Sequence, residues 1–253
     1  ARPFTILVLA DLLGVPEEDH KAFCDNFGPV PGQVGSDREI VRNPLDFLTG
    51  ITTGYIEDRR HRPRQDGLRE LARATFPDGS TPTVADVVNT ATFLFGAGQD
   101  TSARLITAAL RLLGERPELQ RQLRQQRHRI PDFLEEVLRM EPPVKCNFRV
   151  ARVALRLGDV DVAPGTTVML LIGALNRDPR RFEQPGEFCL ERRNAREHLS
   201  FGRGIHACAG APLARAEARI SLERMFDRSS DLRIAAARHG PVGARRYEYE
   251  PTY

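Results

Sequence analysis

The stretch HLSFGRGIHACAGAPLARAEARI, residues 198–220, is the least scaffold-like part of this chain. A histidine, a cysteine and three glycines fall within residues 202–210, and Pro212 then predicts the start of a helix. Unpaired backbone N–H groups and the positive dipole end at a helix start stabilise a thiolate. Glycines there allow a large planar group to approach. Cys208 is therefore either a ligand for a soft metal centre or a buried structural cysteine in a glycine-rich turn.

Composition excludes several classes of protein. The 253 residues suffice for one large domain, and no linker or repeat divides them. The formal net charge is only +3, with both signs interspersed, so no nucleic-acid-binding stripe is expected. The longest apolar run, residues 4–15, is too short for a transmembrane segment, and no signal peptide is visible. We expect a cytoplasmic protein.

The four cysteines are Cys24, Cys146, Cys189 and Cys208. No two of them have the spacing of a zinc knuckle, a redox motif or a covalent haem attachment. In a reducing compartment all four are expected to be thiols. The three other than Cys208 are expected to be buried apolar side chains.

Apolar periodicity predicts a helix-rich fold. Helices are expected over residues 16–27, 44–61, 131–140 and from 212 onward, with a long helix from Thr83 to about Gly114. Thr83 and Asp86 have the spacing of a capping box at the start of that long helix. Between residues 149 and 175 the period changes, and strands are expected over 152–157, 160–162 and 167–172.

Two polar groups interrupt apolar helices. Residues 98–102, GQDTS, lie in the middle of the long helix, where the hydrogen-bond ladder can open and admit water. Alternatively, Thr101 bonds back to its own turn. Glu136 and Arg139 share one helix face. They form either a solvated ion pair or, as their apolar neighbours favour, a buried cluster with Arg192.

The pattern Phe201-x-x-Gly204-x-His206-x-Cys208-x-Gly210 resembles the haem-binding signature of the cytochrome P-450 haem-thiolate monooxygenases, of the soluble bacterial type. Other motifs of that family follow the same order. EVLR resembles its Glu-x-x-Arg pair, AGQDTS its distal-helix motif, and NRDPRRFEQP with FCLER the segment that carries its second arginine. The resemblance covers essentially all 253 residues.

The resemblance implies a mainly α fold with a small antiparallel β region. Residues 1–253 would form a single haem-binding catalytic domain, the C-terminal two-thirds of the family fold, without its N-terminal part and its extreme C-terminus. The implied cofactor is haem b, with the Cys208 thiolate as axial ligand of the iron. The other implied cofactor-binding residues are His206, Arg149 (with Arg152 as a nearby alternative), Phe201, Gly98 and Gly210.

The resemblance also implies an activity. One atom of O2 would enter a small hydrophobic organic substrate, with Asp100 and Thr101 delivering protons and Glu136, Arg139 and Arg192 serving the scaffold. A ferredoxin-type donor would supply electrons at a basic face. The implied substrate pocket is Val144, Lys145, Cys146 and Asn147, and the basic face is Arg203, Arg215, Arg219 and Arg224. Two alternatives stay open: a non-catalytic or truncated haem-binding protein, such as a sensor or a decayed enzyme, and a peroxide-driven haem-thiolate enzyme.

Overall fold

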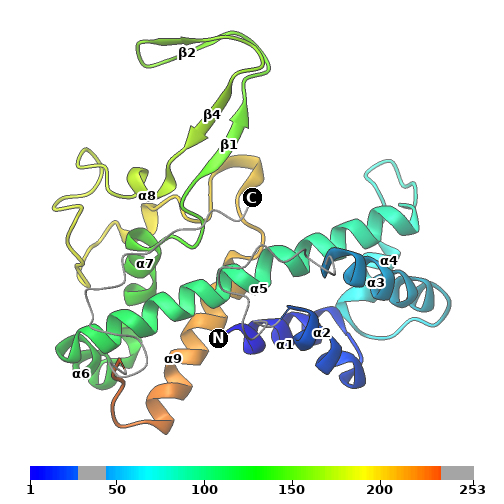
Figure 1. Ribbon diagram of the computed structural model, residues 1–253, viewed down its shortest axis with the longest axis horizontal. Helices are drawn as coiled ribbons and strands as arrows, with labels where there is room; N and C mark the ends of the chain where they lie inside the picture. Colours follow the sequence, from blue (N-terminus) through cyan, green and yellow to red (C-terminus); the bar gives the residue numbers. More distant parts are fainter. Residues whose placement is uncertain (28–43, 235–253) are drawn as a thin grey trace, which may run out of the picture. The chain divides into compact units, whose positions relative to one another are not determined.

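A computed structural model describes residues 1–27 and 44–234 (Figure 1). The described chain is mainly helical with two small antiparallel sheets, as the sequence predicts. The helices are α1 (Arg2–Leu13), α2 (His20–Phe27), α3 (Pro44–His61), α4 (Gly67–Arg73), α5 (Val84–Glu115), α6 (Pro117–Gln125), α7 (Ile130–Met140), α8 (Ile172–Leu175) and α9 (Ala211–Arg228). The strands are β1 (Asn147–Val150), β2 (Leu155–Leu157), β3 (Val160–Val162) and β4 (Thr167–Leu170).

The chain divides into two compact units. The first contains residues 1–105 and 202–217, and the second contains residues 106–201 and those from 218 onward. Within the part of the chain that the structure describes, no helix is long and apolar enough to cross a membrane.

The core of the first unit is built by α1 to α4 and the first half of α5. The apolar run at residues 4–15 is a core helix here, with Ile6 and Ala10 fully buried. The Phe23 ring contacts the rings of Phe47 and Phe95 edge-on, at 5.4 and 5.1 Å between centroids. This aromatic cluster fixes α2 and α3 on α5.

A buried arginine joins α1, α3 and α4. Arg59 of α3 is 2% exposed and donates to the Gly14 carbonyl at 2.9 Å and to the Asp66 carboxylate at 2.8 Å. Asp66 also caps α4 by accepting the Arg69 backbone N–H at 2.8 Å. Gly67 follows at the start of α4, where a Cβ atom would stand 2.5 Å from the Leu12 carbonyl oxygen.

We expect Gly67→Ala to lower the free energy of unfolding by about 1–3 kcal/mol, because the added methyl meets rigid backbone and forces α1 and α4 apart. Urea denaturation measures the change. Gly54→Ala is the matched control. Its Cβ would meet nothing within 4 Å, so removing a mid-helix glycine from α3 is expected to stabilise the chain by about 0.5–1 kcal/mol. Equal effects of the two substitutions would contradict the close approach at Gly67.

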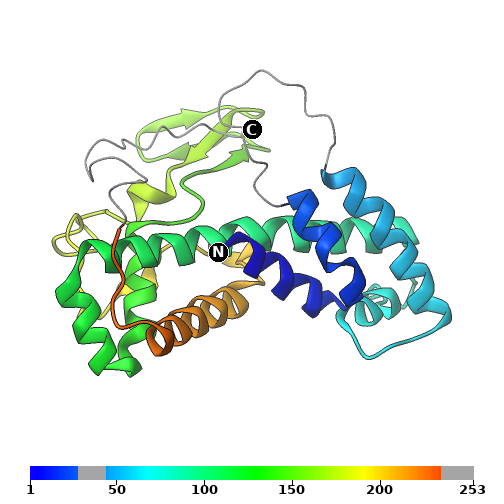
Figure 2. The ribbon, with the colours of Figure 1, turned by 60° about the horizontal axis from the view of Figure 1, so that its bottom comes forward.

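Helix α5 begins with the predicted capping box. The Thr83 hydroxyl accepts the Asp86 N–H at 3.2 Å, and the Asp86 carboxylate accepts the Thr83 N–H at 3.0 Å. The helix then continues through residues 98–102 without interruption to Glu115 (Figure 2). The polar group at its centre therefore does not break the helix.

The sheets of the second unit differ in part from the prediction. β1 pairs with β4, with Asn147 opposite Leu170, and β2 pairs with β3. Residues 152–154 lie outside the strands because the chain turns at Ala151, whose N–H and carbonyl bind Thr166 and Gly165. The strand predicted to reach Ile172 ends at Leu170, since the Gly173 N–H bonds the Lys145 carbonyl at 3.1 Å and α8 begins.

Candidate functional site

The loop before α9 presents its cysteine to the surface. All residues from 202 to 210 are exposed, including Cys208. Gly202 and Gly204 have φ of +67° and +81°, a left-handed backbone that glycine adopts without strain. The Ala211 N–H bonds the Cys208 carbonyl at 3.3 Å as α9 begins. An exposed Cys208 does not fit the alternative of a buried structural cysteine.

The other cysteines are half-buried, not fully buried as expected. Cys189 lies in a loop, Cys24 is in the short helix α2, and Cys146 directly precedes β1. Only Cys208 combines an exposed thiol with a glycine-rich loop and the start of a long helix.

The loop has the features that a haem-thiolate ligand needs. The space beside Cys208 is open: a Cβ on Gly204 would meet nothing within 4 Å, and one on Gly210 would meet only the Cys208 Sγ, at 3.8 Å. Exposed Ile205, 96% accessible, offers apolar surface in the same loop. A soft anionic donor with open space beside it fits the chemistry of haem iron.

The remaining cofactor candidates come from both units. His206 is exposed in the loop of the first unit. Phe201 and Arg149 belong to the second unit. Phe201 is half-buried, with its ring 5.8 Å from that of His198, and Arg149 is exposed on β1, where it donates to the Phe148 carbonyl at 2.8 Å. Gly98 faces α1, since its Cβ would stand 3.1 Å from a Leu9 methyl carbon.

Asp100 and Thr101 are both engaged in hydrogen bonds. Asp100 accepts from Arg2 at 3.0 Å and from Arg104 at 2.6 Å. Burial would raise the pKa of Asp100, but the bonds and charges of the two arginines outweigh it and hold that pKa below its usual value. The Thr101 hydroxyl donates to the Ala97 carbonyl at 2.9 Å. Thr101 thus bonds back to its own turn, the second of the two interpretations of GQDTS.

The structure brings Glu136, Arg139 and Arg192 together. Arg139 donates twice to the Glu136 carboxylate, at 2.8 Å each, and Arg192 donates at 3.1 Å. Both members of the Glu136–Arg139 pair are 0% exposed. Burial would raise the pKa of Glu136, but these bonds and the Cys189 N–H lower it on balance.

The cluster ties a long loop to α7. Arg139 also donates to the carbonyl oxygens of Asn176, Pro185 and Glu187, at 3.0, 2.8 and 3.0 Å. One guanidinium therefore holds the segment 176–187 through its fork of donors. The cluster has the geometry of a scaffold element and offers no free group for chemistry.

A second buried pair, which the sequence did not single out, lies one residue earlier on α7. His198 Nε2 stands 3.1 Å from the Glu135 carboxylate, and His198 Nδ1 accepts the Ser200 N–H at 3.1 Å. Asn176 accepts the Leu199 N–H at 2.7 Å. These bonds fix the segment that enters the cysteine loop. The histidine at the start of the quoted stretch is the signal that could have revealed them.

The predicted substrate-pocket segment is partly committed to structural contacts. Lys145 pairs with Glu141 at 2.9 Å, and Asn147 is the first residue of β1. Val144 is exposed and Cys146 half-buried. The segment therefore leaves an apolar side chain and a thiol accessible, while its lysine is neutralised.

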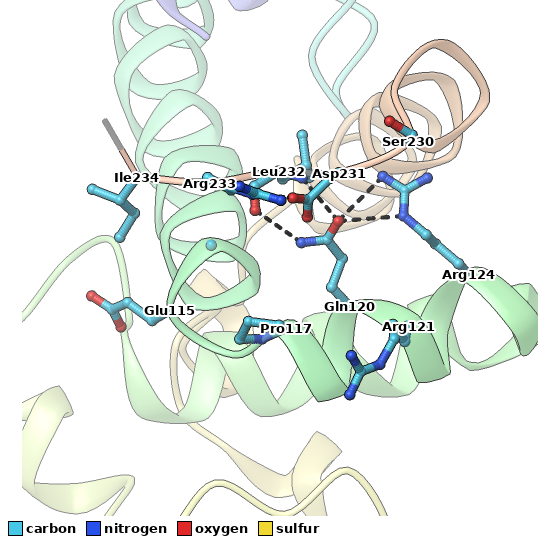
Figure 3. Close-up of a pocket in the computed structure, with 11 residues that line it drawn as sticks. Glu115, Pro117, Gln120, Arg121, Arg124, Ser230, Asp231, Leu232, Arg233 and Ile234 are labelled. Carbon is cyan, nitrogen blue, oxygen red and sulfur yellow. Dashed lines mark hydrogen bonds and ion pairs between the residues drawn. The ribbon is translucent and has the colours of Figure 1, made fainter. Parts of the chain in front are cut away.

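A cleft of about 790 Å³ lies elsewhere in the second unit, between α6 and the chain after α9 (Figure 3). Gln120 bonds the backbone of Leu232 in both directions, at 2.9 and 3.0 Å, and Arg124 binds the Ser229 carbonyl at 2.7 Å. The principal polar side chains of this cleft, Gln120 and Arg124, thus hold the chain that follows α9.

The arginines predicted to form a basic face are exposed at 203, 219 and 224, whereas Arg215 is half-buried.

Comparison with known proteins gives matches along most of the chain. The family described as "Cytochrome P450" matches residues 18–230. The chain is 37% identical over 243 residues to Cytochrome P450 144 of Mycobacterium tuberculosis. It is 35% identical over 242 residues to cyclomarin C epoxidase CymV of Salinispora arenicola. These alignments cover 93% and 92% of this chain but 55% and 60% of the two relatives.

Solved structures agree with these sequence matches. Substrate-free cytochrome P450 CYP150A6 of Mycobacterium marinum superposes with a TM-score of 0.89 at 56% identity, covering 100% of this chain and 59% of that one. CYP109E1 of Bacillus megaterium in complex with corticosterone gives 0.81 at 32% identity, covering 90% of this chain and 62% of that one. The chain therefore spans less than two-thirds of the length of these relatives.

Proposed function

The chain belongs to the cytochrome P450 family, and we propose that residues 1–253 form the haem-binding domain of a monooxygenase, an oxidoreductase that transfers one oxygen atom of O2 to a small hydrophobic organic substrate. One observation carries the proposal: an exposed Cys208 in a glycine-rich loop that opens α9. Haem bound there supplies O2 activation, driven by electron donation from the thiolate.

The residues of the chain have distinct proposed roles toward haem b. Cys208 would hold the haem iron through its thiolate, and Gly210 leaves the backbone beside the sulfur uncrowded. His206 and Arg149 are charge-assisted donors to the carboxylates of haem. By its place in the family signature, Phe201 would screen the sulfur from water. Cys208, His206, Phe201 and Gly210 match the family signature, and the first two lie in the exposed loop. Arg149 lies outside the signature, and its support is the resemblance and its exposure on β1.

The proposed proton path on α5 consists of Thr101 and Asp100, and both already make hydrogen bonds. Thr101 would have to release the Ala97 carbonyl before its hydroxyl could donate a proton elsewhere, and the Asp100 carboxylate, held as an anion by Arg2 and Arg104, would receive and return protons. Gly98 lets α1 pack closely on α5 at this point, because a Cβ there would stand 3.1 Å from a Leu9 methyl carbon. The acid and the alcohol favour an O2-dependent reaction over a peroxide-driven one.

We expect Thr101→Ala to uncouple the reaction. With a substrate and a competent reductase system, reductant consumption should continue while hydrogen peroxide replaces product, because the proton donor is missing. Thr90→Ala is the matched control, since the Thr90 hydroxyl makes the same bond one turn back, to the Asp86 carbonyl at 2.9 Å, on the same helix. Full coupling in Thr101→Ala would remove Thr101 from the proton path.

The proposal also includes an electron donor and a cellular location for the protein. The exposed arginines 203, 219 and 224, with Arg215, suit an acidic ferredoxin-type donor, whose reduction rate should then fall with rising salt. The four free thiols fit a reducing compartment such as the cytoplasm. Expressing the 253-residue chain alone tests whether it retains haem, and product formation by the haem-loaded chain then separates a catalytic domain from a truncated haem-binding protein.

A further inference from the structure

Glu217 on α9 is a buried carboxyl group without a partner. Its exposed fraction is 4%, and neither carboxylate oxygen makes a hydrogen bond of ordinary geometry, although the Ser102 hydroxyl lies close enough to interact with the group. It lies in the first unit together with Cys208 and the first half of α5. Leu213, one turn earlier on α9, packs against the apolar core of that unit, so this face of α9 points inward.

No charged residue lies one turn from Glu217 on its own helix. The residues one turn away on its own helix are uncharged: Leu213, Ala214, Ile220 and Ser221. Its polar neighbour on α5 is Ser102, and the residues one turn from Ser102 are also uncharged: Gly98, Gln99, Leu105 and Ile106. The nearest charged side chains along α5, Asp100 and Arg104, pair with each other, and Asp100 also pairs with Arg2. Among the described residues Glu217 has no ion pair.

A carboxylate buried without a cation or a donor is strongly unfavourable, whereas the neutral acid carries its own proton to donate. Burial accordingly raises the pKa of Glu217 above its usual value, and the Ser102 hydroxyl opposes that rise only in part. The burial of Glu217 and the lack of an ion pair thus both favour the neutral, protonated form.

We propose that Glu217 is a neutral carboxylic acid in the folded protein, and that its proton, shared with Ser102, positions the first turns of α9 and hence the Cys208 loop. Glu217 is then a positioning residue that acts through α9. The proposal goes beyond the proposed monooxygenase function, and its tests need no bound haem.

The proposal determines how the stability of the folded chain changes with pH. A raised pKa in the folded state means that the stability from this proton is fully present below the unfolded pKa of 4.5 and is lost as pH rises through the folded pKa. Between those two values one extra proton is bound on folding. The unfolding equilibrium constant should therefore rise by up to about tenfold per pH unit in that window.

The first test compares the full chain with Glu217→Gln, which mimics the neutral acid. The ratio of the wild-type to the Glu217→Gln unfolding constant in urea should rise with pH between the unfolded and folded pKa values of Glu217. Above the folded pKa the ratio should stay constant. Glu223→Gln is the matched control: Glu223 lies on the same helix but pairs with Arg219 at 3.0 Å. A constant ratio for Glu217→Gln across the pH range would overturn the proposal.

The second test detects the proton directly. At neutral pH the wild-type infrared spectrum should contain the C=O stretch of a protonated carboxyl that shifts in D2O and is missing from Glu217→Gln. A wild-type spectrum without such a band at neutral pH overturns the proposal even if the variant fails to fold.

The third test concerns positioning. Amide exchange over residues 211–217, corrected for intrinsic rates, should accelerate with rising pH in wild type relative to Glu217→Gln. A neutral Glu217 with unchanged exchange would overturn the positioning role. A chain that passes all three tests but binds no haem would overturn only the monooxygenase function.

Discussion

Replacing Cys208 with serine is expected to abolish the red-shifted Soret band of the ferrous carbon monoxide complex, because that band requires a thiolate as a ligand of the haem iron. A serine hydroxyl is far less acidic and donates little electron density. The loop itself should persist, since its turn rests on glycine backbone and on the bond from the Ala207 N–H to the Gly204 carbonyl at 3.0 Å. The measurement is the reduced, CO-treated absorption spectrum of the haem-reconstituted chain.

The other cysteines are the matched controls for this substitution. Cys24, Cys146 and Cys189 are half-buried thiols outside the glycine-rich loop, and serine at each should leave the band in place. If the band survives in Cys208→Ser, another residue binds iron and the site is misassigned. If it disappears in one of the controls as well, the loss reports failed folding and not a lost ligand.

The features that the sequence predicted well are local ones. The capping box of Thr83 and Asp86, and the glycine-rich loop before α9, are each specified within a few consecutive residues. The long helix α5 follows from a periodic apolar pattern that no proline interrupts. Such features depend on backbone preferences and nearby side chains, so one sequence suffices to infer them.

What the sequence could not predict depends on distant partners. Asp100 is paired with Arg2, 98 residues away, and His198 with Glu135, 63 residues away. No spacing rule connects such residues before the fold is known. The short helix α4 was missed for a different reason: it takes its cap and its arginine partner from Asp66 and Arg59, so tertiary contacts and not periodicity define it.

Glu217 could be predicted in part from local sequence and in part only from the fold. Its sequence context already lacks a charged residue one turn away on either side, which is unusual in a helix so rich in arginine. Only the structure adds that this face is buried against the core and that Ser102 of α5 is the neighbour. An unpaired acid on an otherwise uncharged helix face is therefore a signal worth seeking in sequence.

The buried cluster on α7 leads to the second large effect. Arg139→Ala is expected to lower the free energy of unfolding by about 3–5 kcal/mol at neutral pH, because it leaves Glu136 as a buried charge with one arginine fewer. The carbonyl oxygens of Asn176, Pro185 and Glu187 lose their donor at the same time. Arg139→Lys should recover part of the loss, since one ammonium keeps the charge but cannot reach all these acceptors.

The pH dependence of the stability lost in Arg139→Ala distinguishes the effect of the buried Glu136 charge from the effect of lost packing. The depressed pKa of Glu136 contributes stability that is present above its usual value of 4.5 and is lost as pH falls through the folded pKa. The deficit of Arg139→Ala should therefore shrink when urea unfolding is repeated at acid pH. Arg121→Ala is the control, because Arg121 pairs with Glu118 at the same spacing, 3.2 Å apart, but both are exposed. That change should cost about 0–1 kcal/mol. An Arg139→Ala deficit as small as the control's would show that the guanidinium does not hold segment 176–187 on α7.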